Sequence, residues 1–393
     1  MAQRIKASIN PDILVWARQT AGYSQEEAAK KIGISQLTLH KWESGQDFPT
    51  LKQLRNSGNV YKRPTALFYR TIAPTDVPKL PDFRLVYDKD SHEYTPQLRL
   101  EIRRAFDRRA TAISVSTLLN ETPNEFKLSA TINDTPESVA KLIRAAINVS
   151  IEKQYSWKDH YEALRTWVAS IEALGVLVFH INHVEVEQSR GFSIGEHPYP
   201  VVAINGKDSP RGRIFTLFHE LTHIILHNSG VCNLRDNYEN PHHNVEYFCN
   251  QVAGEFLVPN TELLQQDVVI ENKGNWEWDE WRLSTLANRF MVSQEVILRR
   301  LLSLKRTTEQ FYNQKREEYL EVYRRQGEEN SGGFIPYHRR VLRTNGRAYT
   351  NLVLNAYYND SITSRDLSNF LGGIKLDHIV KIEQEIGRGG IDA

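Results

Sequence analysis

The chain has 393 residues, a length that favours two or three domains over a single hydrophobic core. Its 40% hydrophobic and 25% charged residues and its net charge of +1 are typical of a soluble globular protein. No apolar run reaches the roughly 18 to 20 residues that a membrane-spanning helix needs. Two cysteines, Cys232 and Cys249, are too few for a disulfide framework, and the N-terminal residues lack the apolar stretch of a secretory signal. The sequence therefore predicts a cytoplasmic protein with no membrane partner.

Positive charge is concentrated toward the N-terminus. Residues 1–70 contain eleven Lys or Arg and five acidic residues, so this segment carries a charge of +6 and the remainder carries −5. A basic module on a slightly acidic body favours contact with nucleic acid. A solvated basic surface would give the same count.

Residues 10–68 contain the start and stop signals of four short helices. Pro11 suits the first turn of a helix, and Gly22 suits the position that follows its end. Ser24 and Ser35 are predicted N-caps of a second and a third helix, which a glycine turn separates. A fourth helix is predicted within DFPTLKQLRNSGNVY.

The run SQEEAAKKIGISQLTLHKWESGQDFPTLKQL resembles the Xre-type helix-turn-helix. Its apolar residues are spaced to pack two helices together and to leave one face of the third helix for the major groove. Such modules usually read two half-sites, so we expect double-stranded operator DNA as a partner and a homodimer as the assembly; use of the module for protein contacts is the alternative. Trp42 and Glu43 are expected to hold the module together. The predicted DNA contacts are Gln36, Thr38, His40 and Lys41 at base edges or phosphates, and Gln25 at a phosphate.

The remaining chain alternates long helical patterns with two β-branched runs. We expect a proline-rich linker or wrapping arm at 71–95 and strands at 175–181 and 200–205. The predicted fold class is α+β, with domains at 1–70 (helix-turn-helix), 96–327 (a small sheet with helices) and 328–393 (a small, mostly helical C-terminal module). Helices are predicted at about 96–120, 137–149, 158–173, 211–227, 241–257 and 280–304, followed by a charged helix that ends in the flexible joint GEENSGG.

The stretch FTLFHELTHIILH contains an H-E-x-x-H motif within a helix that is apolar on nearly every face, which indicates a buried helix. His219 and His223 lie four residues apart, so both imidazoles project from one stripe and are able to bind one Zn²⁺. Glu220 follows the first histidine and is predicted to be the general base that takes a proton from the attacking water. Buried histidines satisfied within a core are the alternative.

A zinc site needs a third protein ligand. His227 shares the stripe, but it lies about 12 Å along the helix from His219, too far for a tetrahedral site. Glu246 on the next helix is the better candidate, and Asn250, four residues later, is predicted to accept a hydrogen bond from a ligand imidazole. Other candidates remain for the ligand set and for the oxyanion that peptide hydrolysis creates. Glu239, His242 and His243 could compete as ligands, Arg213 and the His242–His243 pair could stabilise the oxyanion, and Cys249 is expected in the core.

Three segments, RGRIFTLFHELTHIILH, VEYFCNQVAGEFLVP and LSTLANRFMVSQEVILRRL, together resemble the ImmA/IrrE family of cytoplasmic zinc metallopeptidases. The resemblance covers most of residues 75–305, and FLVP is a minor departure from the family pattern. It implies a zincin-like fold with one Zn²⁺ per chain. It also implies that His219, His223 and Glu246 bind the metal and that Glu220 is the catalytic acid and base.

Family peptidases cleave DNA-bound repressors, so the leading hypothesis is a DNA-binding regulator with a zinc endopeptidase that cleaves a repressor-type protein. The rival hypothesis is a non-proteolytic Xre autoregulator or antitoxin that binds a toxin through its peptidase-like domain. Because an uncontrolled protease would be harmful, we also expect the C-terminal module or DNA to gate the activity.

Overall fold

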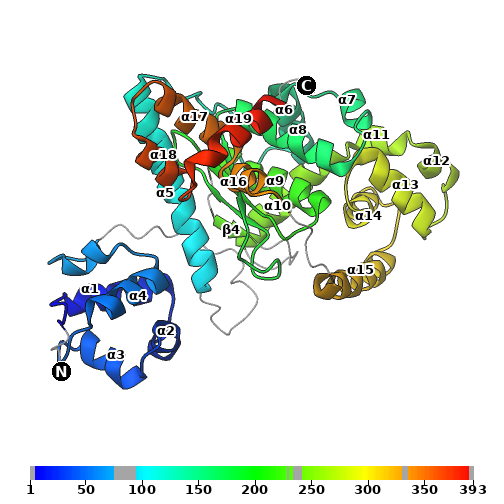
Figure 1. Cartoon of the computed structure of the whole chain (residues 1–393). Coiled ribbons are helices and arrows are strands. Elements are labelled where there is room, and N and C mark those ends of the chain that lie inside the picture. Colours follow the sequence, from blue (N-terminus) through cyan, green and yellow to red (C-terminus); the bar gives the residue numbers. More distant parts are fainter. Residues whose placement is uncertain (1–4, 75–93, 228–229, 233–240, 330–334, 389–393) are drawn as a thin grey trace. The chain divides into compact units, whose positions relative to one another are not determined.

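A computed structural model of the chain describes residues 5–74, 94–227, 230–232, 241–329 and 335–388 (Figure 1). For residues 230–232, 241–244, 323–329 and 388 it describes the backbone alone. The chain divides into two compact units, residues 1–79 with 87–107 and residues 80–86 with 108–393. Most of the linker expected at 71–95 lies outside the described residues. No described helix is both long and apolar enough to cross a membrane.

The first unit is helical and begins and ends its helices where the sequence predicts. Asn10 caps the first helix, and Ser24 forms a reciprocal capping box with Glu27 at the start of the second. Ser35 caps the third helix through the backbone N–H of Thr38. The elements are α1 (Pro11–Ala21), α2 (Gln25–Ile32), α3 (Gln36–Glu43), α4 (Leu51–Tyr61) and the 3₁₀ helix η1 (Thr65–Tyr69).

A compact core holds these helices together. Trp42, near the C-terminal end of the third helix, is buried as expected among apolar side chains from all four helices. Glu43 accepts hydrogen bonds from Arg18 Nε at 2.7 Å and from Gln25 Nε2 at 2.9 Å, so one carboxylate ties together α1, α2 and α3. The core extends only from Ala7 to Ala73.

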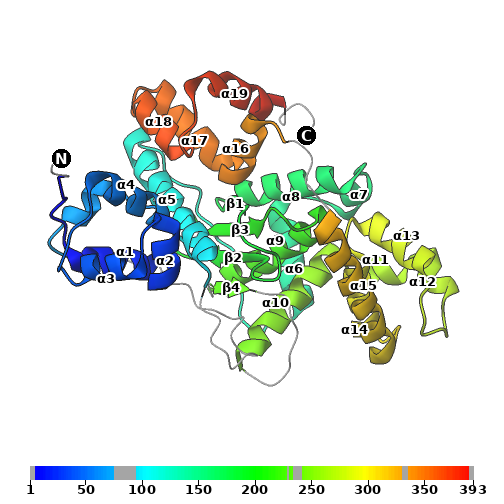
Figure 2. The same cartoon turned by 60° about the horizontal axis from the view of Figure 1, so that its bottom comes forward.

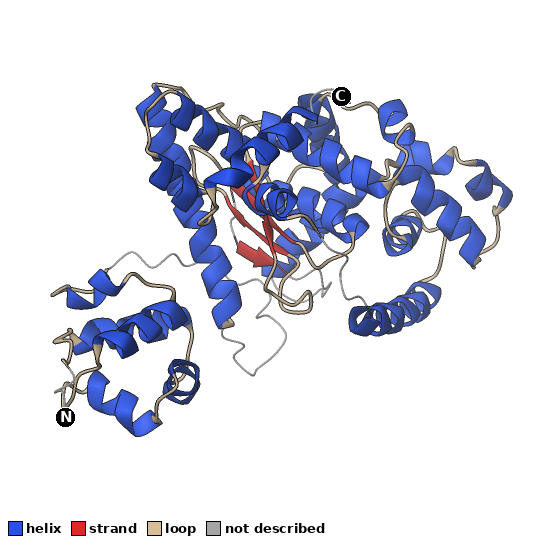
Figure 3. Ribbon diagram, in the orientation of Figure 1, coloured by secondary structure: helices blue, strands red, loops and turns tan. Residues whose placement is uncertain are grey.

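The second unit is built around a small sheet with helices on it, as Figure 3 shows. Strands β1 (Leu177–Ile181) and β3 (Val201–Asn205) pair in parallel, and β2 (Gly191–Ile194) pairs antiparallel with β3. β4 (Gly230–Cys232) pairs antiparallel with β2 at the opposite edge, which gives the order β1-β3-β2-β4. The predicted α+β class is therefore confirmed, although the sequence did not predict β2 and β4.

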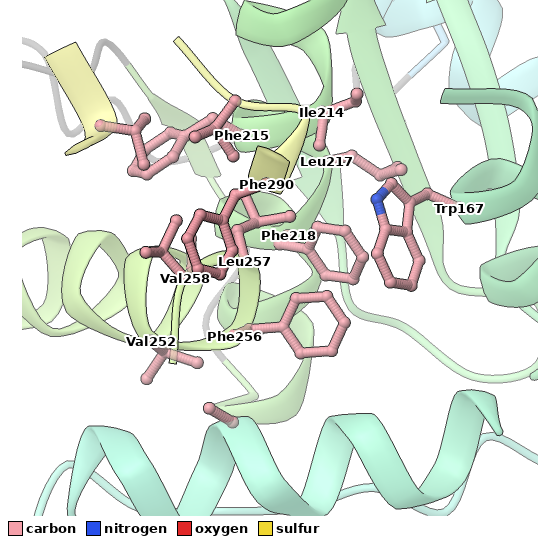
Figure 4. Close-up of a cluster of buried hydrophobic side chains, with 14 of the residues drawn as sticks. Trp167, Ile214, Phe215, Leu217, Phe218, Val252, Phe256, Leu257, Val258 and Phe290 are labelled. Atoms are coloured by element: carbon pink, nitrogen blue, oxygen red, sulfur yellow. The ribbon is translucent and has the colours of Figure 1, made fainter. Parts of the chain in front are cut away.

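Helix α9 (Pro210–Ile225) packs on β2 and β3 with one side and on α10 (Pro241–Leu257) with another. The rings of Trp167, Phe218 and Phe256 meet in the core beside it, with Phe218 and Phe256 stacked at 4.0 Å between centroids (Figure 4). Burial on all sides explains why α9 is apolar nearly all round. The helices that precede the sheet in the chain are α5 (Pro96–Leu119), α6 (Pro136–Ile147), α7 (Ile151–Tyr155) and α8 (His160–Ala173). Of these, α8 packs on α9 and α6 packs on α10.

The segment 280–304 was predicted as one helix, and this prediction was wrong. Met291 has a left-handed backbone (φ 57°) and ends the first helix, and Ser293 caps the next by accepting from the N–H of Val296. This break turns the chain between two helices that pack on each other. The elements here are α11 (Asn260–Leu264), α12 (Asp267–Glu271), α13 (Glu280–Phe290), α14 (Gln294–Ser303) and α15 (Glu309–Glu329).

The C-terminal residues form a small helical group beside the β1 edge of the sheet (Figure 2). α16 packs on β1, and the ring of Tyr349 meets that of Phe179 edge-on at 5.9 Å. Thr363 caps the third helix of the group in a capping box with Asp366. The elements are α16 (Tyr337–Asn345), α17 (Arg347–Tyr358), α18 (Ser364–Phe370), η3 (Leu376–His378) and α19 (Ile379–Arg388).

Candidate metal centre and nucleic-acid interface

Helix α9 starts with strong local signals and continues into the core. Ser209 caps it by accepting from the N–H of Gly212, and Pro210 occupies the first helical position. Every residue from Arg213 to Ile225 is buried. The H-E-x-x-H motif is thus held on a rigid helix between the sheet and α10.

Three potential ligands converge between α9 and α10. His219 Nε2 lies 3.2 Å from Glu246 Oε2, and His223 Nε2 lies 3.1 Å from Glu246 Oε1. The two Nε2 atoms are 3.2 Å apart. Among the described residues, these three side chains form the group able to hold a metal ion.

The donor atoms fit a zinc ion. With bonds of about 2.0–2.1 Å, ligand atoms at the corners of a tetrahedron around zinc lie about 3.3–3.4 Å apart. The observed separations of 3.1 to 3.2 Å are close to this spacing. Two imidazole nitrogens and a carboxylate oxygen are also a ligand set of catalytic zinc sites, which keep the fourth position for water or substrate.

The protonation states suit metal binding. Burial lowers the pKa of His219, which keeps its imidazole neutral near pH 7. Burial alone would raise the pKa of Glu246, but His223 and His219 outweigh it and hold this pKa well below its usual value. The group therefore offers the neutral imidazole of His219 and an ionised carboxylate.

Asn250 supports the group from α10. Its Oδ1 lies 3.0 Å from His219 Nδ1, and the residue is buried. An acceptor at this place fixes the tautomer that leaves Nε2 unprotonated and directed at the other ligands.

Glu220 lies beside the group, facing β2. A side chain at Gly191 on β2 would place its Cβ 3.2 Å from Glu220 Oε1 and 2.6 Å from Thr216 Cγ2. The absence of a side chain at 191 thus lets the strand approach α9 and leaves space for the carboxylate. The fully buried Glu220 is next to the metal-binding group without belonging to it.

Other residues considered from the sequence are placed elsewhere. His227 follows the end of α9 and its Nε2 lies 3.1 Å from Ser129 Oγ, so it does not join the group. Cys249 is fully buried, with its thiol hydrogen-bonded to His223 and its pKa raised by burial. Arg213 interacts electrostatically with Arg343 and Asp208. The side chains of His242 and His243, and all of Glu239, lie outside the described residues.

Of the residues expected to contact DNA, three are exposed and two make hydrogen bonds within the helix-turn-helix. Gln36, His40 and Lys41 are exposed along α3. Thr38 is half-buried, and its Oγ1 lies 2.7 Å from the Oγ of its own N-cap, Ser35. Gln25 donates through its amide nitrogen to Glu43, and the backbone N–H groups at the start of α2 are the donors suited to a phosphate.

One exposed residue on α3 was missed. Leu37 is 64% exposed although it is apolar, and it lies between Gln36 and Thr38. An exposed leucine on a recognition helix is suited to contact a thymine methyl group. Its position within the motif QLTLHKW was visible in the sequence, but an exposed leucine cannot be distinguished there from a core leucine.

Comparison with known families agrees with this geometry. Residues 171–302 match the peptidase family model described as the IrrE N-terminal-like domain, and residues 14–56 match a helix-turn-helix model. No curated protein matches the chain. The resemblance drawn from the motifs is confirmed. The chain combines a DNA-binding helix-turn-helix with a domain of metallopeptidase fold.

Proposed function

We propose that this protein is a DNA-binding transcriptional regulator whose central domain is a zinc endopeptidase that cleaves a repressor-type protein bound to DNA. The observation that carries the proposal is the convergence of His219, His223 and Glu246 at tetrahedral spacing, next to the carboxylate of Glu220. Buried ligands on two packed helices suit a preorganised catalytic site.

The three ligands would hold one Zn²⁺ per chain. A zinc ion bound there supplies a Lewis acid that polarises a peptide carbonyl and lowers the pKa of water to about 7. Asn250 holds the His219 imidazole in the orientation that binding requires.

Glu220 performs the proton transfers in this proposal. Its carboxylate accepts a proton from the attacking water and returns it to the amine that leaves when the peptide bond breaks. Its fixed position between α9 and β2 keeps the carboxylate oriented without an entropic cost during the reaction.

The helix-turn-helix would bring the peptidase to its substrate. Gln36, His40 and Lys41 are exposed on α3 and would contact operator DNA, with Gln25 and Thr38 positioned by contacts within the module. Two copies on a two-fold symmetric operator would form a homodimer. A repressor bound at a neighbouring site would then be presented at high local concentration.

The test compares the wild type with Glu220→Gln at equal zinc content. Newly formed N-termini are measured in lysate of the source cell after each protein is added. We expect wild type alone to produce new termini, with at least about a 100-fold loss in Glu220→Gln because general acid–base catalysis contributes this much. Glu185→Gln, an exposed carboxylate paired with Lys207, is the matched control and is expected to cleave normally.

Equal cleavage by Glu220→Gln would overturn the mechanism. If neither protein cleaves, and both bind zinc and operator DNA, the peptidase proposal is wrong. The protein would then be a non-proteolytic autoregulator or antitoxin that binds a partner such as a toxin through the same domain. Loss of zinc in His223→Ala checks the ligand assignment separately from activity.

A further inference from the structure

Three nitrogen-bearing side chains, two of them buried and one half-buried, are electrostatic neighbours outside the metal-binding group. His180 lies on β1, Arg213 on the first turns of α9, and Arg343 on α16. Arg213 and His180 are only 6% and 7% exposed. We call these three residues the arginine cluster.

Arg213 is buried without an acceptor for its charge. It makes no hydrogen bond and no ion pair with any residue that the structure describes, and its Nε is fully enclosed. Arg343 Nη2 donates to the Gly206 carbonyl at 2.6 Å, but its buried Nε has no partner in the described part of the chain. His180 Nδ1 is a third enclosed polar atom without a hydrogen-bond partner there.

The nearest carboxylate does not neutralise the cluster. Asp208 interacts with Arg213 electrostatically, yet its Oδ2 accepts from Arg190 Nη1 at 3.0 Å and its Oδ1 accepts from the Ser209 N–H at 2.7 Å. Burial and the charge of Arg343 lower the pKa of Arg213 to about 10, which still leaves it ionised at pH 7. The buried charge of Arg213 and the half-buried charge of Arg343 therefore lie near one carboxylate that is already paired. Unpaired buried charges are strongly unfavourable.

The location is also suited to an anion. His180 is near the carboxyl end of β1, and Gly206 directly follows the parallel strand β3. The N-terminal turns of α9, at the positive end of the helix dipole, follow within four residues. Ligands bind preferentially outside the carboxyl ends of parallel strands, beside helix N-termini.

The cluster is open on one side. Arg343 is half-buried, and Tyr161, whose hydroxyl interacts electrostatically with both guanidinium groups, is 53% exposed. At Gly206, a Cβ would lie 3.1 Å from Arg343 Nη2, so the glycine leaves room for the guanidinium. The exposed side of the cluster is thus the side of Tyr161 and Arg343.

We infer that the arginine cluster is a binding site for a small oxyanion, a phosphate or a carboxylate. Planar guanidinium groups bind both anions through paired, charge-assisted hydrogen bonds. The inference does not depend on peptidase activity.

Occupation of the site would couple two parts of the second unit. Arg213 belongs to the helix that carries His219 and Glu220, and Arg343 belongs to the C-terminal helical group. An anion held by both would clamp α16 to the first turns of α9. The oxyanion is thereby expected to stabilise the arrangement of the C-terminal group on the sheet.

The experiment measures thermal unfolding and calorimetric binding with the full chain. Inorganic phosphate and succinate are titrated separately at constant ionic strength against chloride, because general salt effects act on any surface charge. We expect a saturable rise of several degrees in the melting temperature with at least one of the two probes. The comparison of the two identifies the class of anion.

Two substitutions and a control test the assignment. Arg213→Met and Arg343→Met are expected to weaken probe binding at least about tenfold, since each removes charge-assisted hydrogen bonds. Without a probe, Arg213→Met is expected to melt above the wild type, because it removes an unpaired buried charge. Lys207→Met, next to Gly206 but exposed and paired with Glu185, is expected to respond like the wild type.

Absence of a saturable response to both probes in the wild type would overturn the inference. Probe binding and a rise in melting temperature equal to those of the wild type in both arginine variants would also overturn it. A lower melting temperature of Arg213→Met in chloride, with probe binding retained, would assign the arginine a structural role instead. If Arg213→Met does not fold, the test uses Arg343→Met alone, because Arg343 is half-buried. Unchanged probe binding by Arg343→Met would then overturn the inference.

Discussion

Glu172, near the end of α8, caps the N-terminus of α17, a helix that begins 175 residues later in the chain. Its Oε1 accepts from the Ala348 N–H at 3.2 Å, and no side chain of Gly346 is present to cap α17. A carboxylate is favourable at the positive end of a helix, but Glu172 is also half-buried. Burial raises the pKa of Glu172, whereas the backbone hydrogen bonds at the start of α17 and the charge of Arg347 lower it. The effect of burial is larger, and the pKa rises to about 7.

This raised pKa predicts how stability changes with pH. The unfolded pKa is about 4.3, so between pH 4.3 and 7 the folded state holds a proton that the unfolded state has released. Stability therefore falls as pH rises through this range. Glu172→Gln keeps an acceptor for Ala348 and is expected to stabilise the protein by about 1–3 kcal/mol at pH 8 and by little at pH 4.5. Melting temperatures of both proteins across this range provide the measurement.

Glu137→Gln serves as the control for this prediction. The Glu137 carboxylate is exposed and accepts from Lys141 Nζ, which lowers its pKa. Its substitution is therefore expected to bring no stabilisation at pH 8. A constant difference between wild type and Glu172→Gln at all pH values would contradict the proposed burial effect.

Site residues could be predicted from the sequence where they lie close together along the chain. The spacing of His219, Glu220 and His223 was visible because a helix converts spacing of four into a shared face. Glu246 and Asn250 followed from the same rule on the next helix. The arginine cluster could not be predicted, because the position of Arg343 near His180 and Arg213 depends on how α16 packs against β1.

At the scale of elements, a buried ion pair joins α10 to α14. Arg300 contacts Glu255 through Nη2, and the two side chains are each 7% exposed. Arg300 Nε also donates to the Val258 carbonyl at 3.1 Å, and the Asn260 N–H donates to Glu255 Oε1 at 3.1 Å. The pair thus forms hydrogen bonds with the backbone groups of Val258 and Asn260, just after the end of α10, the helix that carries Glu246.

Removal of one partner should be more harmful than replacement of both. Glu255→Ala leaves Arg300 buried without its carboxylate and is expected to lower the free energy of unfolding by about 3–5 kcal/mol. The double variant Glu255→Leu with Arg300→Met is expected to lose less, because no buried charge remains. Urea unfolding of the three proteins gives the comparison. A greater loss in the double variant would show that the ion pair itself is the main stabilising contact.

Element boundaries were predicted best where a polar side chain caps a helix. Ser24 and Ser35, the predicted N-caps, each accept the expected backbone hydrogen bond. The strands were predicted less well. β2 and β4 have four and three residues, too few for a periodic pattern, and β2 is recognisable only through its pairing with β3.

At the scale of the whole second unit, the C-terminal helical group packs against the sheet and contributes to the core of the unit. Val341, Leu342, Tyr349 and Val353 are buried. Gly346 has a φ of 74°, and a Cβ there would lie 2.4 Å from the Val178 carbonyl. The helices of this group cover the edge strand β1.

Deletion of residues 336–393 is therefore expected to destabilise the unit by several kcal/mol, because it exposes the apolar side chains that this group buries. Melting temperature and binding of a hydrophobic dye provide the readout. Loss of peptidase activity in this truncation would not by itself demonstrate gating. An unchanged melting temperature without dye binding would instead show that the sheet is stable alone, and truncation would then be a direct test of gating.

The order in which the chain is synthesised gives this packing another consequence. The core of the helix-turn-helix ends at Ala73, so that module can fold while most of the protein is still to be translated. The edge strand β1 receives its cover only when residues 341–354 have left the ribosome, more than 150 residues after β1 itself. A nascent chain would thus acquire its DNA-binding form long before it completes the sheet that supports the metal-binding helix.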